Sequence, residues 1–226
     1  MFFVIISYST KGSCLQDRNS ARGSRRKNKI RVYRYKGLRL QIAPEVFHPG
    51  FYFSTQFLLQ HISSMKLKGK NFLELGCGSG LISMVAVQKE AGVTATDINP
   101  VAVEFLKENC LRNKLQMKIF KSDMFDEIPE MQYDIIAINP PYYKKDPVTL
   151  YDHAWFCGAN GEYFSNLFQS LHSYIHPETD ILMILFDGCD MEMIHAFAAA
   201  NNFVLACVHR KINMLEKNFI YKIERK

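Results

Sequence analysis

The regular alternation of short apolar runs with helical stretches constrains the fold of this chain most strongly. From residue 70 onward, strands are predicted over 70–75, 92–97, 116–123, 133–139, 180–187, 203–211 and 218–224. Helices are predicted between them over 80–90, 100–113, 160–175 and 190–201. Such alternation is typical of a parallel sheet with helices on both faces. We therefore predict an α/β fold with a doubly wound, seven-stranded, mostly parallel sheet.

The last two predicted strands differ from the others in how they connect. Only a few residues link 203–211 to 218–224, which is too short for a parallel crossover. These strands are therefore expected to form an antiparallel hairpin at the sheet edge. The strands over 180–187 and 203–211 are nearly solid apolar, which predicts burial on both of their faces.

A separate β-hairpin is predicted ahead of the sheet, with strands over 30–35 and 38–42 and Gly37 in the turn. A proline- and glycine-interrupted loop follows, and Ser54 is expected to cap the first helix. We expect residues 30–226 to form one domain, in which 30–43 is a hairpin extension and 44–226 is the core.

The net charge of +6 is concentrated at the N-terminus. Residues 1–39 contain eleven Lys or Arg and one acid, whereas residues 40–226 contain seventeen Lys or Arg and twenty-one acids. The basic arm over 1–29 is interpreted either as a phosphate- or partner-binding extension or as a solvated, disordered leader. Gly, Ser and Asn interrupt the basic run, and no aromatic is interleaved in it before Tyr33, which favours the disordered arm.

Membrane, disulfide and metal sites are not expected. The apolar stretch over 1–8 is far shorter than a membrane span of about 20 residues, and it lacks the flanks of a signal peptide. The six cysteines include no C-x-x-C pair, which argues against a zinc site and suits a reducing cytoplasm. We therefore expect a cytoplasmic protein with no metal and no membrane contact.

The stretch "LELGCGSG" over 73–80 carries the first chemical signal. Gly76, Gly78 and Gly80 directly follow a predicted strand and open a helix, where missing side chains let the backbone approach a ligand. Glu74 precedes this turn, and Asp97 ends the next strand about 20 residues on. That is the expected position of an acceptor for ribose hydroxyl groups.

The stretch "NPPY" over 139–142 carries the second signal, at the end of a buried strand where open α/β sheets place ligands. Proline has no N–H, so Pro140 and Pro141 stiffen the turn and leave nearby carbonyls without local partners. The side-chain oxygen of Asn139 and the carbonyl of Pro140 are both acceptors, and together they could hold one planar NH2 group. Tyr142 could stack on a planar amide or base.

The alternate spacing of the glycines departs from the dinucleotide-binding pattern and resembles the class I S-adenosylmethionine-dependent methyltransferases. The resemblance implies that "TDINP" and "KSDMF" complete the cofactor site: Asp97 accepts from the ribose, Ile98 packs on the adenine, and Asp123 accepts from its amino group, with Met124 beside it. Asn99 is expected to be a helix N-cap, with Pro100 at the first helical position. The implied S-adenosylmethionine-binding residues are Glu74, Gly76, Cys77, Gly78, Gly80, Asp97, Ile98, Asp123, Met124 and Asn139.

Residues 44–226 resemble, more specifically, the HemK-type methyltransferases that modify glutamine nitrogen in translation release factors. "LELGCGSG", "TDINPVAVE", "AINPPY" and "HAWFCGANGEYF" follow that pattern in order. The resemblance implies that Asn139, Pro140 and Tyr142 are the catalytic residues. The chain departs from the pattern before the first helix, where the family usually carries an acidic pair and "HPGFYFSTQFLL" carries none, leaving Phe53, Ser54 and Thr55 to border the cofactor.

Three functions remain open from the sequence. The leading one is methylation of a glutamine side-chain amide in a protein resembling a translation factor, by a monomeric enzyme. The alternative is methylation of adenine N6 or guanine N2 in nucleic acid, in RNA rather than DNA. The basic arm favours nucleic acid, whereas the acidic balance of the remainder argues against a broad phosphate-binding surface. The third is a catalytically silent binding module on the same scaffold.

Overall fold

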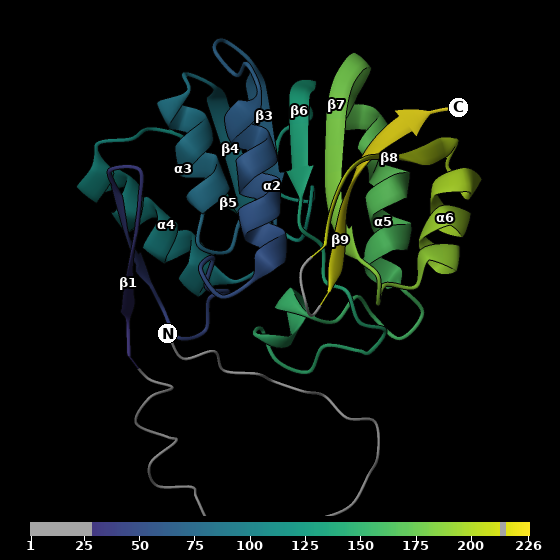
Figure 1. Cartoon of the computed structure of the whole chain (residues 1–226), viewed down its shortest axis with the longest axis horizontal. Helices are drawn as coiled ribbons and strands as arrows, with labels where there is room; N and C mark the ends of the chain where they lie inside the picture. Colours follow the sequence, from purple (N-terminus) through teal and green to yellow (C-terminus); the bar gives the residue numbers. More distant parts are fainter. Residues whose placement is uncertain (1–28, 213–215) are drawn as a thin grey trace, which may run out of the picture.

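Seven strands form one sheet in the computed structural model, which describes residues 29–212 and 216–226 (Figure 1). They are β3 (Asn71–Leu75), β4 (Gly92–Asp97), β5 (Lys118–Lys121), β6 (Tyr133–Ile138), β7 (Ile175–Phe186), β8 (Phe203–Ile212) and β9 (Lys217–Arg225). Their spatial order is β5-β4-β3-β6-β7-β9-β8, and β9 is antiparallel to both of its neighbours while the other pairs are parallel. The predicted fold class and the terminal antiparallel hairpin are confirmed.

Helices cover both faces of this sheet. They are α2 (Phe53–Ser64), α3 (Leu81–Gln88), α4 (Pro100–Asn113), α5 (Glu162–Ser170) and α6 (Met191–Ala200), with short 3₁₀ turns η1 (Asp152–Ala154) and η2 (Leu171–Tyr174). Successive side chains of a strand point to opposite faces. On β3, Phe72 therefore packs in the apolar cluster that includes α2, α3 and α4, and Leu73 packs in the cluster that includes α5 and α6. No helix in the described ranges is long and apolar enough to cross a membrane.

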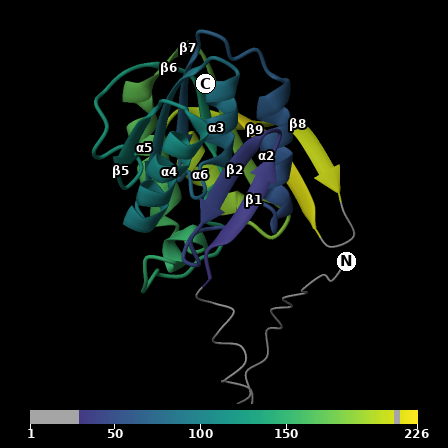
Figure 2. The same cartoon turned by 90° about the vertical axis from the view of Figure 1, so that its left-hand side faces the viewer.

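The predicted N-terminal hairpin is present as β1 (Arg31–Tyr35) and β2 (Leu38–Ile42), and it docks on α4 (Figure 2). Two asparagines one helical turn apart on α4 bond the free edge of β2. Asn109 exchanges two hydrogen bonds of 2.8 Å with the backbone of Gln41, and Asn113 exchanges two of 2.9 Å with that of Arg39. The hairpin is thus fixed to the core by hydrogen bonds from asparagine side chains of α4 to the backbone of β2. Apart from Lys29, the arm predicted over 1–29 lies outside the described residues.

Two sequence predictions are wrong. Ser54 does not cap α2: the helix begins at Phe53, Tyr52 occupies the N-cap without a side-chain capping bond, and Ser54 is buried within the first turn. The strand predicted over 203–211 is not buried on both faces, because residues 207–212 of β8 are exposed. The reason is that β9 inserts between β7 and β8 and leaves β8 at the edge, which composition alone cannot reveal.

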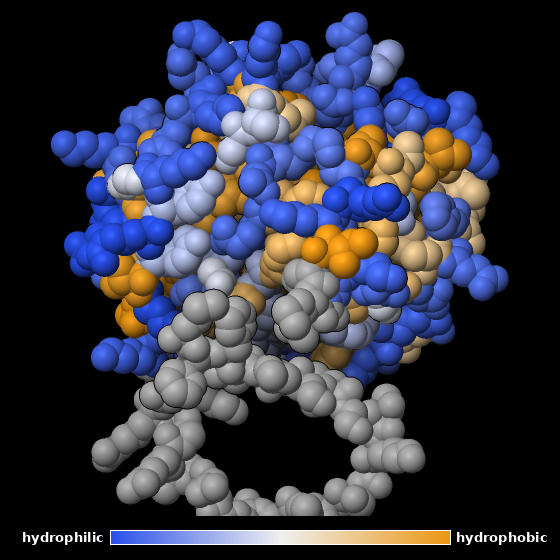
Figure 3. All heavy atoms as spheres, viewed as in Figure 1, coloured by the Kyte–Doolittle hydropathy of each residue, from blue (hydrophilic) through white to orange (hydrophobic). Residues whose placement is uncertain are grey.

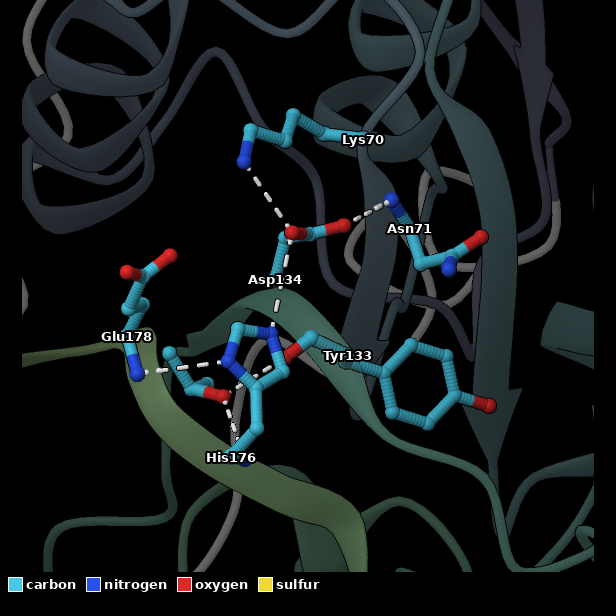
Figure 4. A network of polar contacts seen from close by, with 7 residues as sticks. Lys70, Asn71, Tyr133, Asp134, His176 and Glu178 are labelled. Carbon is cyan, nitrogen blue, oxygen red and sulfur yellow. Dashed lines mark hydrogen bonds and ion pairs between the residues drawn. The ribbon is translucent and has the colours of Figure 1, made fainter.

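A polar network ties the starting ends of β3, β6 and β7 together (Figure 4). The carboxylate of Asp134 accepts from the Lys70 ammonium at 3.0 Å and from the Asn71 backbone N–H at 2.7 Å. His176 Nε2 lies 3.6 Å from the same carboxylate, and His176 Nδ1 accepts from the Glu178 backbone N–H at 3.2 Å. The Asn71 N–H holds the pKa of Asp134 below its usual range. These contacts hold the starting ends of the three strands together. The carboxyl ends of the strands, at the opposite edge of the sheet, are the end where α/β sheets bind ligands.

Candidate active site

The site lies where the strand order reverses between β3 and β6. The chain runs outward from β3 through β4 to β5 and then returns to β6 on the other side of β3. Loops that leave the carboxyl ends of these two neighbouring strands diverge, and the crevice between them is where α/β sheets bind ligands. The glycine turn follows β3 and the NPPY stretch follows β6, so both predicted motifs line one cavity.

Two of the three glycines keep the turn open toward this cavity. Gly76 and Gly78 have φ of 69° and 49°, a region that favours glycine. A Cβ at Gly76 would meet no atom within 4 Å, and one at Gly78 would meet only the Phe47 Cβ at 3.6 Å. Gly80 is different: it does not line the cavity, and its Cβ would collide with Leu106 of α4. The third glycine therefore serves helix packing and does not border the ligand space.

Glu74 braces the turn from behind. Its carboxyl oxygen accepts from the Ser83 backbone N–H at 2.8 Å and from the Ser83 hydroxyl. The first N–H groups of a helix have no partners within the helix, and Glu74 satisfies one of them in α3. Burial raises the pKa of Glu74 to about 8 against the lowering effect of these bonds. Although it lines the cavity, Glu74 is thus committed to holding the helix start.

Asp97 connects the glycine turn to the end of β4. One carboxylate oxygen accepts from the Gly78 N–H at 2.7 Å and the other from the Asn99 N–H at 2.9 Å. Burial raises the pKa of Asp97, and the two backbone donors oppose that rise. Each carboxylate oxygen still has a second lone pair for a ligand. The Asn99 side chain accepts from Val101 N–H at 2.9 Å ahead of Pro100, which confirms the predicted N-cap.

The cavity gathers nine of the ten residues predicted to bind the cofactor. These are Glu74, Gly76, Cys77, Gly78, Asp97, Ile98, Asp123, Met124 and Asn139, and only Gly80 stands apart. Sequence reasoning missed a second set of lining residues, including Glu45, Phe47, Ser79, Leu150, His153 and Tyr163. Most of these lie on long loops whose path no local pattern predicts. The one signal was aromatic enrichment in "HPGFYF" and in the segment that contains Trp155.

Hydrogen bonds fix the orientation of the Asn139 amide. Its Oδ1 accepts from the Tyr142 hydroxyl at 2.6 Å, and its Nδ2 donates to Thr55 Oγ1 at 3.3 Å. The Tyr142 hydroxyl also bonds the Ser54 side chain, and burial raises the pKa of Tyr142, so the phenol stays protonated. The first turn of α2 therefore sets which atom of the amide faces which way.

The ring of Tyr142 packs at 5.0 Å from that of Phe186. Stacking of this ring on a substrate stays a prediction. In this structure the Tyr142 hydroxyl donates a hydrogen bond to Asn139.

Three aromatic rings from two loops meet at the cavity. Phe47 stacks on Tyr52 with ring centroids 3.9 Å apart, and Trp155 lies 5.3 Å from Phe47 and 5.2 Å from Tyr52. Phe47 and Trp155 both line the cavity. The loop after the hairpin and the loop after NPPY are thereby joined by apolar contact, beside the polar groups of Asn139 and Tyr142.

The family described as methyltransferase small domain matches residues 38–159, more than half of the chain. The chain belongs to this family. The matched range contains the glycine turn, Asp97 and the NPPY stretch. The recognised resemblance to methyltransferases is confirmed.

One relative is a protein of Methanocaldococcus jannaschii named as a protein N5-glutamine methyltransferase. It is 36% identical over 112 residues, which cover 49% of this chain and 54% of the relative. The chain thus matches about half the length of this relative.

Two solved structures share the fold. The Mtq2–Trm112 complex of E. cuniculi, described as responsible for methylation of the eRF1 termination factor, has a TM-score of 0.62 at 18% identity, covering 80% of this chain and 99% of that one. The T. thermophilus 16S rRNA N2 G1207 methyltransferase, in complex with AdoMet and guanosine, has a TM-score of 0.58 at 17% identity, covering 88% and 50%.

Proposed function

We propose that this chain is an S-adenosylmethionine-dependent methyltransferase that modifies a planar NH2 nitrogen. One observation carries the proposal: the Asn139 amide is held in one orientation beside a cavity that also contains the glycine turn and Asp97. An amide oxygen in a fixed position can accept a hydrogen bond from a substrate NH2 group. A Pro-Pro turn with a structural role alone would not require such an oriented acceptor.

The residues present fit the cofactor. The space in front of Gly76 and Gly78 is open, and Asp97 keeps free lone pairs at the end of β4. We propose that the glycine turn borders the amino-acid tail and that Asp97 accepts from the ribose hydroxyls. Ile98, Asp123 and Met124 would surround the adenine. When bound, S-adenosylmethionine supplies a methyl group on a positively charged sulfur.

The acceptor nitrogen would be held by two oxygens of this chain, Asn139 Oδ1 and the Pro140 carbonyl. Two acceptors on one NH2 group draw its hydrogens aside and leave its lone pair directed out of the plane of those bonds. The Tyr142 hydroxyl already takes one lone pair of Oδ1, which leaves the other for the substrate. We propose that positioning and electrostatics carry the rate and that no strong base is required.

The acceptor is proposed to be either a protein glutamine amide or a nucleobase amine. The M. jannaschii relative supports the glutamine, which the sequence favours. The rings of Phe47, Tyr52 and Trp155 support the nucleobase, because flat bases stack on aromatic side chains. We further propose that residues 30–226 form a single domain that acts as a monomer in the cytoplasm, where the five free cysteines of the described chain would remain reduced.

The test is incubation of the protein with radiolabelled S-adenosylmethionine and a cell lysate, which is then split between nuclease and protease. Label that survives nuclease but not protease identifies a protein acceptor, and the reverse identifies a nucleic acid. Asn139→Ala serves as the matched inactive variant. Equal labelling by wild type and Asn139→Ala, or no labelling by wild type that binds the cofactor, would contradict the proposal.

A further inference from the structure

We propose that the β1–β2 hairpin and the loop after it form a binding surface for single-stranded RNA that leads to the cavity. The inference rests on the proposed function and selects between its two acceptors. No residue before Glu45 lines the cavity, so the hairpin over 31–42 contributes no group to the proposed cofactor site. A separate function for the hairpin can therefore be considered.

The hairpin carries positive charge without compensation. Residues 29–42 contain five Lys or Arg and no Asp or Glu, namely Lys29, Arg31, Arg34, Lys36 and Arg39. All five are exposed, and none takes part in an ion pair with another described residue. An unpaired cationic surface beside a cavity attracts polyanions, and it stands out because residues 43–226 contain seventeen Lys or Arg against twenty-one acids.

Two of these cations face each other directly. Arg34 and Arg39 are cross-strand partners in the antiparallel register, and like charges directly opposite destabilise a hairpin. The docking of β2 uses the backbone of Arg39, so its guanidinium has no structural role in that contact. A phosphate group placed against the two side chains would relieve their repulsion.

Aromatic rings are interleaved with the charge. The Arg31 guanidinium lies 4.9 Å from the centre of the Phe51 ring, and His48 stacks on Phe51 with centroids 4.1 Å apart at 20°. Phe51 is nonetheless 61% exposed, so part of its ring is accessible to a ligand. Desolvation, and then the Arg31 charge, lowers the pKa of His48, so the ring is favoured in its neutral form. Cations that follow a backbone and flat rings that receive bases are the two elements of single-strand recognition.

The surface is continuous with the active site. The loop that carries His48 and Phe51 also carries Glu45 and Phe47, which line the cavity, and Tyr52 in the ring cluster with Trp155. An unpaired base held at Phe51 therefore lies on the path to Asn139. An acidic peptide would satisfy the cations but not the exposed rings, and bases within a duplex could not stack on them. RNA exposes such bases in its loops, which is why we assign this surface to RNA.

The experiment measures binding of a fluorescein-labelled mixed-sequence RNA of about 12 nucleotides by anisotropy across a range of salt concentrations. The test variant is Arg34→Glu with Lys36→Glu. The control is Lys66→Glu with Lys68→Glu, an equal charge change at exposed residues before β3, at the other end of the sheet. We expect the hairpin variant to lose at least about tenfold in RNA affinity. The slope of log binding constant against log salt concentration should fall in magnitude by about two, while the control stays near wild type.

Stacking is tested separately with Phe51→Ala, which should lose about tenfold, and Phe51→Tyr, which should retain binding because the ring remains. Circular dichroism checks that each variant is folded. Equal loss in the hairpin and control variants, or tighter binding of labelled polyglutamate or of the matching DNA than of RNA, would overturn the proposal. Calorimetry with S-adenosylmethionine separates the two claims: a wild type that binds the cofactor but no RNA refutes this surface alone, whereas absence of cofactor binding refutes the proposed function.

Discussion

The Tyr142 hydroxyl donates to Oδ1 of Asn139 at 2.6 Å, and this contact joins the two ends of the NPPY turn. On its other side the same amide donates from Nδ2 to Thr55, 84 positions earlier in the chain. The acceptor atom proposed for catalysis is therefore oriented by a helix that belongs to neither motif. With the amide oxygen and nitrogen interchanged, the Tyr142 hydroxyl would have to accept and the Thr55 hydroxyl would have to donate, so the observed orientation depends on Tyr142 donating to Asn139.

Replacing Thr55 with valine should lower turnover without weakening the binding of S-adenosylmethionine. Valine keeps the shape but cannot accept from Asn139 Nδ2, so the amide loses part of its orientation. One hydrogen bond of about 1 kcal/mol predicts a decrease in kcat of about fivefold. Steady-state kinetics and calorimetry measure the two quantities. Thr55→Ser should recover activity, and a serine variant as impaired as valine would argue that only packing matters.

Asn139→Ala should reduce methyl transfer by at least about 100-fold, the usual effect of deleting an oriented polar group at a reacting centre. The substitution removes the proposed NH2 acceptor and leaves the glycine turn and Asp97 in place. Affinity for S-adenosylmethionine, measured by calorimetry, should therefore stay close to wild type. Turnover that survives in this variant would remove Asn139 from the mechanism.

Asp97→Ala should weaken S-adenosylmethionine binding by about 1–3 kcal/mol, because it deletes the proposed ribose acceptor. It also leaves the N–H groups of Gly78 and Asn99 without an acceptor, because they donate no other hydrogen bond in the described structure, and this should loosen the turn. Calorimetry gives the affinity, and thermal unfolding reports the loosening separately. Wild-type affinity in the variant would refute the role in binding.

The stability of the protein should decrease between about pH 4.5 and pH 8 in part because of Glu74. Its usual pKa of 4.5 is raised to about 8 in the folded state by burial. Between these values the folded protein retains a proton that the unfolded chain has released, so the free energy of unfolding falls as pH rises.

Urea unfolding at pH 5 and pH 8 measures this dependence. Glu74→Gln cannot titrate and should flatten it, while Asp134→Asn, at the other end of the sheet, should leave this pH window unchanged. Equal slopes in wild type and Glu74→Gln would contradict the assignment.

The sequence alone determined the elements and the chemical character of the site. Alternating apolar periods predicted all seven strands, and Gly76, Gly78, Asp97 and Asn139 were found because each belongs to a short motif at the end of a strand. In a parallel α/β sheet the strand ends share one edge, so motifs far apart in sequence can be assigned to one site before the structure is known.

Only the tertiary structure decided which distant groups meet. Local periodicity carries no information on the neighbour of Gly80, which is Leu106, or on the partner of Asn139, which is Thr55. For the same reason the apolar sequence of β8 predicted burial on both faces, whereas the insertion of β9 between β7 and β8 left residues 207–212 exposed. The sequence specifies residue types and their spacing, and long-range packing assigns each of them its contacts.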